Sequence, residues 1–244
     1  MKPRDAAEKT AGRIGDLPAQ FMLDSETYTQ SSDLGFEGID FYFTGRGGAL
    51  GSVDGNVVAA AFVFFNPQTV CESWKRGTAV IAPDKAAHTF ASFCHSWARD
   101  HLADESENGR IDYARIAELT GKVISNADAA GAPVFAGWRA LPEPDDSKEL
   151  ALHRLNALRE LRGALHGASV ITHGLRPVEA LMVKTPFMAA LFGWNEDLPD
   201  AEQFRSRWEA AESSTNEMMG RALSVLDSDE LDELVLLLRG VAFS

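Results

Sequence analysis

The sequence has few cysteines and no long apolar segment, and these two absences exclude several classes of protein. Its two cysteines, Cys71 and Cys94, cannot form a disulfide scaffold or a zinc cluster by themselves, and they suit a reducing compartment. The longest apolar run, Val57 to Phe65, is too short to span a bilayer. The N-terminal stretch up to Gln20 has no apolar core of the kind found in signal peptides. We therefore expect a cytoplasmic protein that does not contact a membrane.

Basic side chains are also scarce, because the 244 residues include 23 Lys and Arg against 36 Asp and Glu, which gives a net charge of −13. Binding along nucleic acid requires clustered Lys and Arg, so nucleic acid is not an expected partner. Positive charge is concentrated in residues 151–184, which contain five basic side chains against Glu160 and Glu179. The five are Arg154, Arg159, Arg162, Arg176 and Lys184. An anionic partner would be expected to bind there.

The chain does contain helical periodicity, with apolar residues recurring at steps of three and four. This pattern predicts an all-α, multi-helix fold. Residues 1–35 are polar and contain Pro18, so we expect no long helix there. We favour a helix over a buried strand for residues 57–65, with Asn56 as its N-cap and Asn66-Pro67 starting the next helix. The other expected helices are 84–102, 112–131, 147–173, 177–184, 203–226 and 229–240.

An acidic, polar stretch at residues 104–110 predicts the boundary between two regions. The first, residues 1–105, is expected to be helical and to contain a glycine-rich aromatic turn within residues 36–70. The second, residues 106–244, is expected to pack against the first.

The glycine-rich segment beginning at Gly45 lacks the pattern of a phosphate-binding loop. We therefore expect its glycines to permit a positive φ or a close backbone approach. Arg46 lies among aromatic residues, including Tyr42, and its guanidinium needs a carboxylate, a ligand or a ring as partner. The sequence favours structural pairing but leaves ligand contact open.

The six histidines do not predict a metal site. His88 and His95 are seven residues apart, as are His166 and His173, and on a helix this spacing separates the rings by about 10 Å. No HExxH or CxxC motif supplies further ligands, and no GxSxG nucleophile motif is present. Cys94 is expected to be a core residue. No cofactor is identifiable from the sequence.

The segment from Arg159 to His166 places Glu160 and Arg162 beside Gly163 within an expected helix. Glycine inside a helix costs about 1 kcal/mol relative to alanine. We therefore expect a close approach at Gly163, made by another helix or by a bound molecule.

Three segments together resemble the SalK-like proteins, an actinobacterial family associated with helix-turn-helix or winged-helix folds and without an assigned biochemical activity. They are FYFTGRGGALGSVDGNVVAAAFVFFNPQTV at 41–70, GAPVFAGWRALPEP at 131–144 and LRELRGALHGASVITHGLRPVEALMV at 158–183. The resemblance implies a helix-turn-helix or degenerate winged-helix-like C-terminal half and a link to natural-product metabolism. The family pattern has His where this chain has Leu161 and Asp where it has Ala164, whereas His166 is retained.

The wing of a winged helix is expected to be absent, since residues 200–226 continue as an acidic helical pattern. The recognition helix that the resemblance implies would carry Arg205 and Arg207 but also Glu202, Glu209 and Glu212, and these acids would repel phosphates.

Three functions remain open at this stage. We favour a small-molecule-binding or regulatory protein, in which residues from both distinctive segments form one ligand pocket. The alternatives are a DNA-binding regulator with residues 151–212 as reading head, and a biosynthetic enzyme with His166 as general base. A homodimer is compatible with each. The candidate ligand-binding residues are Tyr42, Arg46, Arg159, Glu160, Arg162 and His166.

Overall fold

The computed structural model describes residues 1–104, 111–195 and 200–243. Within these ranges the chain is helical, with connecting loops and one isolated antiparallel bridge between Leu102 and Phe243. The predicted all-α fold is therefore confirmed, and the described ranges contain no strand pair that could form a wing. The predicted boundary loop at 104–110 lies, except for Asp104, outside the described residues.

The α-helices are α1 (Pro3–Leu23), α2 (Ser25–Asp33), α3 (Asp40–Gly47), α4 (Gly55–Ala61), α5 (Pro67–Val80), α6 (Pro83–His101), α8 (Tyr113–Asn126), α9 (Pro133–Arg139), α10 (Ser147–Thr172), α11 (Pro177–Lys184), α12 (Arg205–Leu223) and α13 (Ser228–Gly240). Short 3-10 helices span Gly48–Leu50, Pro186–Met188 and Ala201–Phe204. No helix in the described part of the chain combines the length and apolarity needed to cross a membrane.

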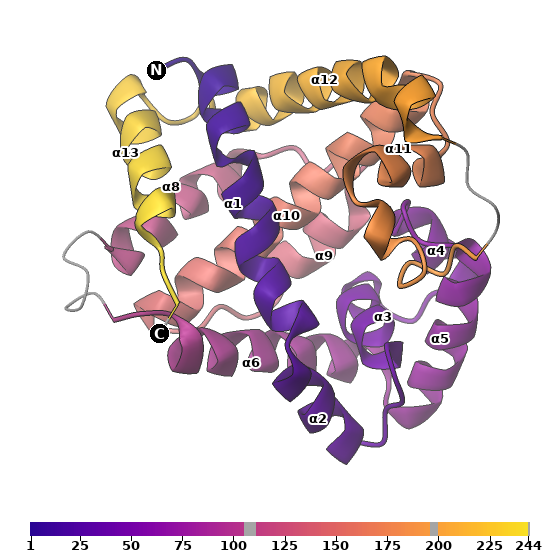
Figure 1. The fold of residues 1–244 in the computed structure, drawn as a ribbon. Coiled ribbons are helices and arrows are strands. Elements are labelled where there is room, and N and C mark those ends of the chain that lie inside the picture. Colours follow the sequence, from indigo (N-terminus) through magenta and orange to yellow (C-terminus); the bar gives the residue numbers. More distant parts are fainter. Residues whose placement is uncertain (105–110, 196–199, 244) are drawn as a thin grey trace.

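Helix α10 is the central element, and it crosses the middle of the molecule (Figure 1). It begins at Ser147 because the Asp146 side chain accepts hydrogen bonds from the backbone N–H groups of Lys148 and Glu149. It packs against α1, α6, α8, α9 and α12, and its buried face includes Leu152, Leu155 and Leu158. Because α10 touches so many neighbours, its side chains reach several parts of the fold.

The prediction that Pro18 would prevent a long helix near the N-terminus is wrong. Pro18 lies inside α1, a 21-residue helix, and is buried. Ile14, Leu17 and Phe21 are buried on this helix, which packs against α6, α10, α12 and α13. A proline inside a helix costs about 3 kcal/mol, and burial of three large side chains at about 1.5–3 kcal/mol each offsets this cost.

The prediction of a glycine-rich turn is wrong for Gly45, Arg46 and Gly47, because these residues lie inside α3. A Cβ at Gly45 would lie 2.7 Å from the Phe90 side chain, and one at Gly48 would collide with the Pro83 carbonyl oxygen of α6. These glycines allow α3 and the following turn to lie directly against α6. The positive φ that was the other expected role occurs at Gly51, where φ is 76°.

The helix predicted for residues 57–65 is present only as α4, which ends at Ala61, and Asp54 rather than Asn56 provides its N-cap. The predicted start at Asn66-Pro67 is confirmed for α5, because the Asn66 side chain accepts from the Gln68 backbone N–H. Helix α8 ends at Asn126, earlier than the predicted Gly131.

The C-terminal helices cover the N-terminal one. Helix α12 packs along α1 and α10, and α13 packs against α1 and α8. Arg13 of α1 donates from Nε to the Leu238 carbonyl oxygen at 2.8 Å. One core cluster contains residues from Ala6 to Val241 and so draws on both predicted regions.

Candidate functional site

A buried ion pair joins the two distinctive segments of the sequence. Arg46 of α3 donates from Nε and Nη2 to the two carboxylate oxygens of Glu160 on α10, at 2.8 and 2.7 Å. The Arg46 Nη1 group donates to the Tyr42 hydroxyl at 3.0 Å. The structural pairing favoured for Arg46 is therefore present, between residues 114 positions apart in the chain.

Aromatic and charged side chains also contact this ion pair. The Arg46 guanidinium carbon lies 4.1 Å from the centre of the Phe62 ring, within cation–π distance. Arg159 donates to the same Glu160 carboxylate at 3.0 Å. Burial raises the pKa of Glu160, but the charges and hydrogen bonds of Arg46 and Arg159 outweigh burial and hold that pKa below its usual value. Glu160 is therefore ionised at neutral pH.

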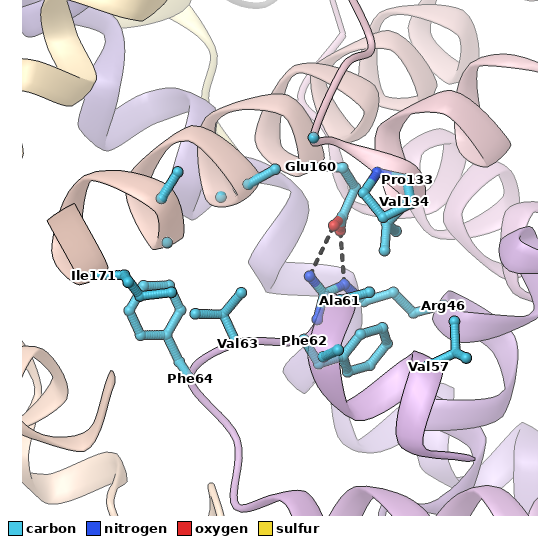
Figure 2. A pocket seen from close by; sticks show the side chains of 16 residues that line it. Arg46, Val57, Ala61, Phe62, Val63, Phe64, Pro133, Val134, Glu160 and Ile171 are labelled. Carbon is cyan, nitrogen blue, oxygen red and sulfur yellow. Dashed lines mark hydrogen bonds and ion pairs between the residues drawn. The ribbon is translucent and has the colours of Figure 1, made fainter. Parts of the chain in front are cut away.

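A pocket of about 410 Å³ opens beside the ion pair. Figure 2 shows Arg46 and Glu160 on one side of it, across from Phe64 and Ile171. Apart from the ion pair its lining is apolar and rich in small residues. The lining residues are Arg46, Val57, Ala60, Ala61, Phe62, Val63, Phe64, Gly131, Pro133, Val134, Glu160, Gly163, Ala164, Gly167, Ala168 and Ile171.

Small residues on one face of α10 create this space. A Cβ added at Gly163 would meet no atom within 4 Å, apart from its immediate neighbours and the helix's own nearby backbone. The close approach expected at Gly163 occurs instead one turn later, at Gly167, where a Cβ would lie 2.9 Å from the Val63 side chain. Gly163 therefore faces open volume, and Gly167 allows the α4–α5 connection to touch α10.

That connection is strained at Val63, which lies on the pocket wall. Val63 has φ of 36°, an outlier for a β-branched residue. The Phe64 N–H donates to the Phe62 carbonyl oxygen at 2.5 Å, which closes a three-residue γ-turn around Val63. Strain of this kind costs about 1–3 kcal/mol and is found preferentially at binding and active sites.

A second cavity, of about 170 Å³, adjoins the pocket. Arg46, Phe62, Phe64 and Gly163 line both spaces. The second cavity is further lined by Ile14, Gly15, Tyr42, Phe65, Arg159, Arg162 and Phe192. Five of the six candidate residues therefore lie around these two adjoining spaces.

The sixth candidate, His166, is placed elsewhere. Its ring stacks on Phe64 with centroids 5.4 Å apart, and its Nδ1 lies 3.1 Å from the Thr215 hydroxyl and 3.2 Å from a Glu212 carboxylate oxygen. It lines neither cavity. Burial lowers the pKa of His166 to about 4, so its ring is a weak base. This environment does not favour the general-base role considered for it.

The sequence does not indicate that the turn at Phe62–Phe64 and the loop residues Gly131 and Pro133 line the pocket. It also does not indicate that Glu212 accepts a hydrogen bond from Arg162 at 2.7 Å. One usable signal was present: Gly163 and Gly167, like Ala164 and Ala168, are four residues apart and therefore share a helix face. In the described ranges no group of three or more His, Cys, Asp or Glu is arranged to hold a metal ion.

The fold and the site define an all-α protein with an apolar pocket that has one charged end. The chain belongs to a helix-turn-helix family, whose model matches residues 7–208. Membership of such a family suggests a regulatory protein. No curated protein and no solved structure matches the chain. This match shows the helix-turn-helix family alone and does not by itself show membership of the SalK-like proteins.

Replacing Glu160 by Gln should lower the free energy of unfolding by about 3–5 kcal/mol, because Arg46 is left as a buried charge without its counter-ion. Urea unfolding followed by circular dichroism measures this loss. The control is Glu143→Gln, which removes a similarly two-pronged carboxylate from the more exposed Arg154 and should cost less than about 1 kcal/mol. Equal costs for the two variants would contradict the importance of the buried pair.

Stability should fall as the pH drops from about 6.5 towards about 4. Burial lowers the pKa of His95, His153 and His166 to about 4 in the folded protein, whereas the unfolded chain protonates near 6.5. The unfolded state therefore binds more protons in this window, and the stabilisation present above pH 6.5 is lost. Urea midpoints at several pH values measure the slope. The His166→Gln variant should show a shallower slope, and an unchanged slope would contradict the neutral buried state of this ring.

Proposed function

We propose that this protein is a regulatory protein that binds a small, mostly apolar molecule in the pocket beside Arg46 and Glu160. The observation that supports this most directly is Gly163, a helical glycine whose missing side chain leaves open volume beside a fixed charge pair. Ligand sites in proteins are concave, have volumes of about 300–1,000 Å³ and combine apolar walls with a few polar groups. The pocket of about 410 Å³ has each of these properties.

The residues that line the pocket also support a narrower proposal. All of them fall within the three segments at 41–70, 131–144 and 158–183, which carry the resemblance to SalK-like proteins. If that resemblance reflects common ancestry, the shared feature is the pocket rather than a DNA-reading helix. A natural-product intermediate of modest size is then a fitting ligand class.

The Gly163→Leu variant should abolish binding of N-phenyl-1-naphthylamine, an uncharged fluorophore made of a naphthalene and a phenyl group, because the new side chain occupies the pocket. The wild-type protein should bind one molecule of this probe with increased fluorescence. The control is Gly12→Leu, which makes the same change on the exposed face of α1. Near-ultraviolet circular dichroism confirms that both variants are folded. Equal probe binding by the two variants would contradict the proposal.

DNA binding is the second candidate function, and membership of a helix-turn-helix family is the observation that favours it. The implied reading helix, α12, packs against α1 and α10 along the face that contains Ala211, Met219 and Leu223. Its exposed side is mixed in charge, since it includes Arg205 and Arg207 together with Glu209 and Glu217. Arg205 is paired with Glu202 at 2.9 Å, and Arg207 donates to the Gly174 carbonyl oxygen. These features favour the small-molecule proposal over DNA binding.

A mobility-shift assay with the DNA upstream of its own gene should show no retarded band at low salt, because a chain with a net charge of −13 repels the phosphates. Low salt is the most permissive condition, since phosphate contacts weaken as salt rises. A retarded band that disappears in the Arg205→Gln, Arg207→Gln double variant would establish α12 as a DNA-binding helix.

A further inference from the structure

The second cavity contains more positive charge than its carboxylate partners balance. Three guanidinium groups, from Arg46, Arg159 and Arg162, line a space of about 170 Å³. Their carboxylate partners are Glu160, which is shared by two of them, and Glu212. Three cations against two anions leave one positive charge in excess around this cavity.

Solvent does not compensate this excess fully. The Arg46 and Glu160 side chains are 10% and 2% exposed, and those of Arg159 and Arg162 are 23% and 17% exposed. Charges that are largely removed from water interact more strongly than surface charges and are screened less by salt. An anion inside the cavity would therefore be attracted at short range.

Unused hydrogen-bond donors are also present. The Nε–H group of Arg162 is buried and has no hydrogen-bond partner. Among the described residues Arg159 makes one side-chain hydrogen bond, to Glu160, although a guanidinium has five N–H groups. The remaining N–H groups of Arg159 can therefore donate to a carboxylate or sulfonate bound in the cavity that Arg159 lines.

The position of this cavity relates it to the proposed ligand pocket. Gly163 lines both spaces and contributes no side chain between them, and Arg46 forms part of both walls. A volume of about 170 Å³ is large enough to accept one small anionic group.

From these observations we infer that the ligand is an amphipathic organic anion, with its apolar body in the pocket and its anionic group against Arg159 and Arg162. This inference rests on the proposed function, because it names the chemical class of the molecule that the pocket binds. It goes further by assigning the smaller cavity as the anion subsite. Carboxylate, sulfonate and phosphate monoester groups share the required chemistry.

Two probes that differ by one sulfonate group test the inference. The first is 1-anilinonaphthalene-8-sulfonate, and the second is N-phenyl-1-naphthylamine, the same molecule without the sulfonate. The Arg159→Gln variant removes the excess charge and leaves the Arg46–Glu160 pair in place. It should weaken sulfonate-probe binding about tenfold or more, because one charge-assisted contact is lost, and should leave the uncharged probe within about twofold. The Arg159→Lys variant should recover most of the sulfonate-probe affinity.

The control is Arg154→Gln, which removes an arginine from the same helix that lines neither cavity and is paired with Glu143. It should leave the dissociation constants of both probes within about twofold of wild type. Raising the salt concentration should weaken only the sulfonate probe.

The outcomes separate the two proposals. If neither probe binds the wild-type protein, both the proposed function and this inference are wrong. A second outcome is that the uncharged probe binds the wild-type protein but not Gly163→Leu, while Arg159→Gln changes the dissociation constants of both probes equally or changes neither. The ligand-binding function then stands, and the anion subsite is wrong. A selective loss of the sulfonate probe in Arg159→Gln, absent in Arg154→Gln, supports the subsite. A series of alkyl carboxylates and alkyl phosphates that compete with the sulfonate probe then shows which anion the subsite prefers.

Discussion

The requirement that a buried charge keep its partner governs the arrangement of this protein. Arg46 and Glu160 come from helices far apart in the sequence, and removing either one would leave the other buried without compensation. The pair therefore fixes α3 against α10, and it does so with a definite geometry because both Glu160 oxygens accept from the same planar group. The aromatic residues around Arg46 and the pocket beside it are positioned as a consequence of this contact.

The pocket next to the pair is maintained by residues that lower helix stability. Gly163 costs helical free energy and fills no space, while Gly167 allows the strained turn at Val63 to touch α10. A sequence selected for stability alone would place larger side chains at 163 and an unstrained residue at 63. Gly163 and Val63 line the same pocket, and selection for ligand binding there would account for both residues.

The sequence predicts much of the helical framework, because N-caps and apolar spacing are local signals. Helix α10 begins at Ser147 and α11 at Pro177, the two starts that the sequence predicts. It does not predict that α1 continues through Pro18, since tertiary burial of its apolar face outweighs the local cost. It places Arg46 and Glu160 among the candidates, but their mutual pairing depends on chain geometry that no local pattern contains. The sequence groups His166 with them because it lies in the same short segment, whereas contacts from α12 and the α4–α5 connection determine where its ring lies.

The packing of the last two helices has a consequence for how the chain can be divided. The family model ends at residue 208, yet Leu223, Leu234 and Leu238 belong to the same core as the first helix, and Arg13 is bonded to the backbone of α13. A fragment truncated at the end of the recognisable match would expose the apolar face of α1 to water and would be prone to aggregation. During synthesis, α1 must likewise wait for residues beyond 208 to leave the ribosome before its apolar face is covered. The boundary of detectable family similarity is therefore not a boundary of autonomous folding.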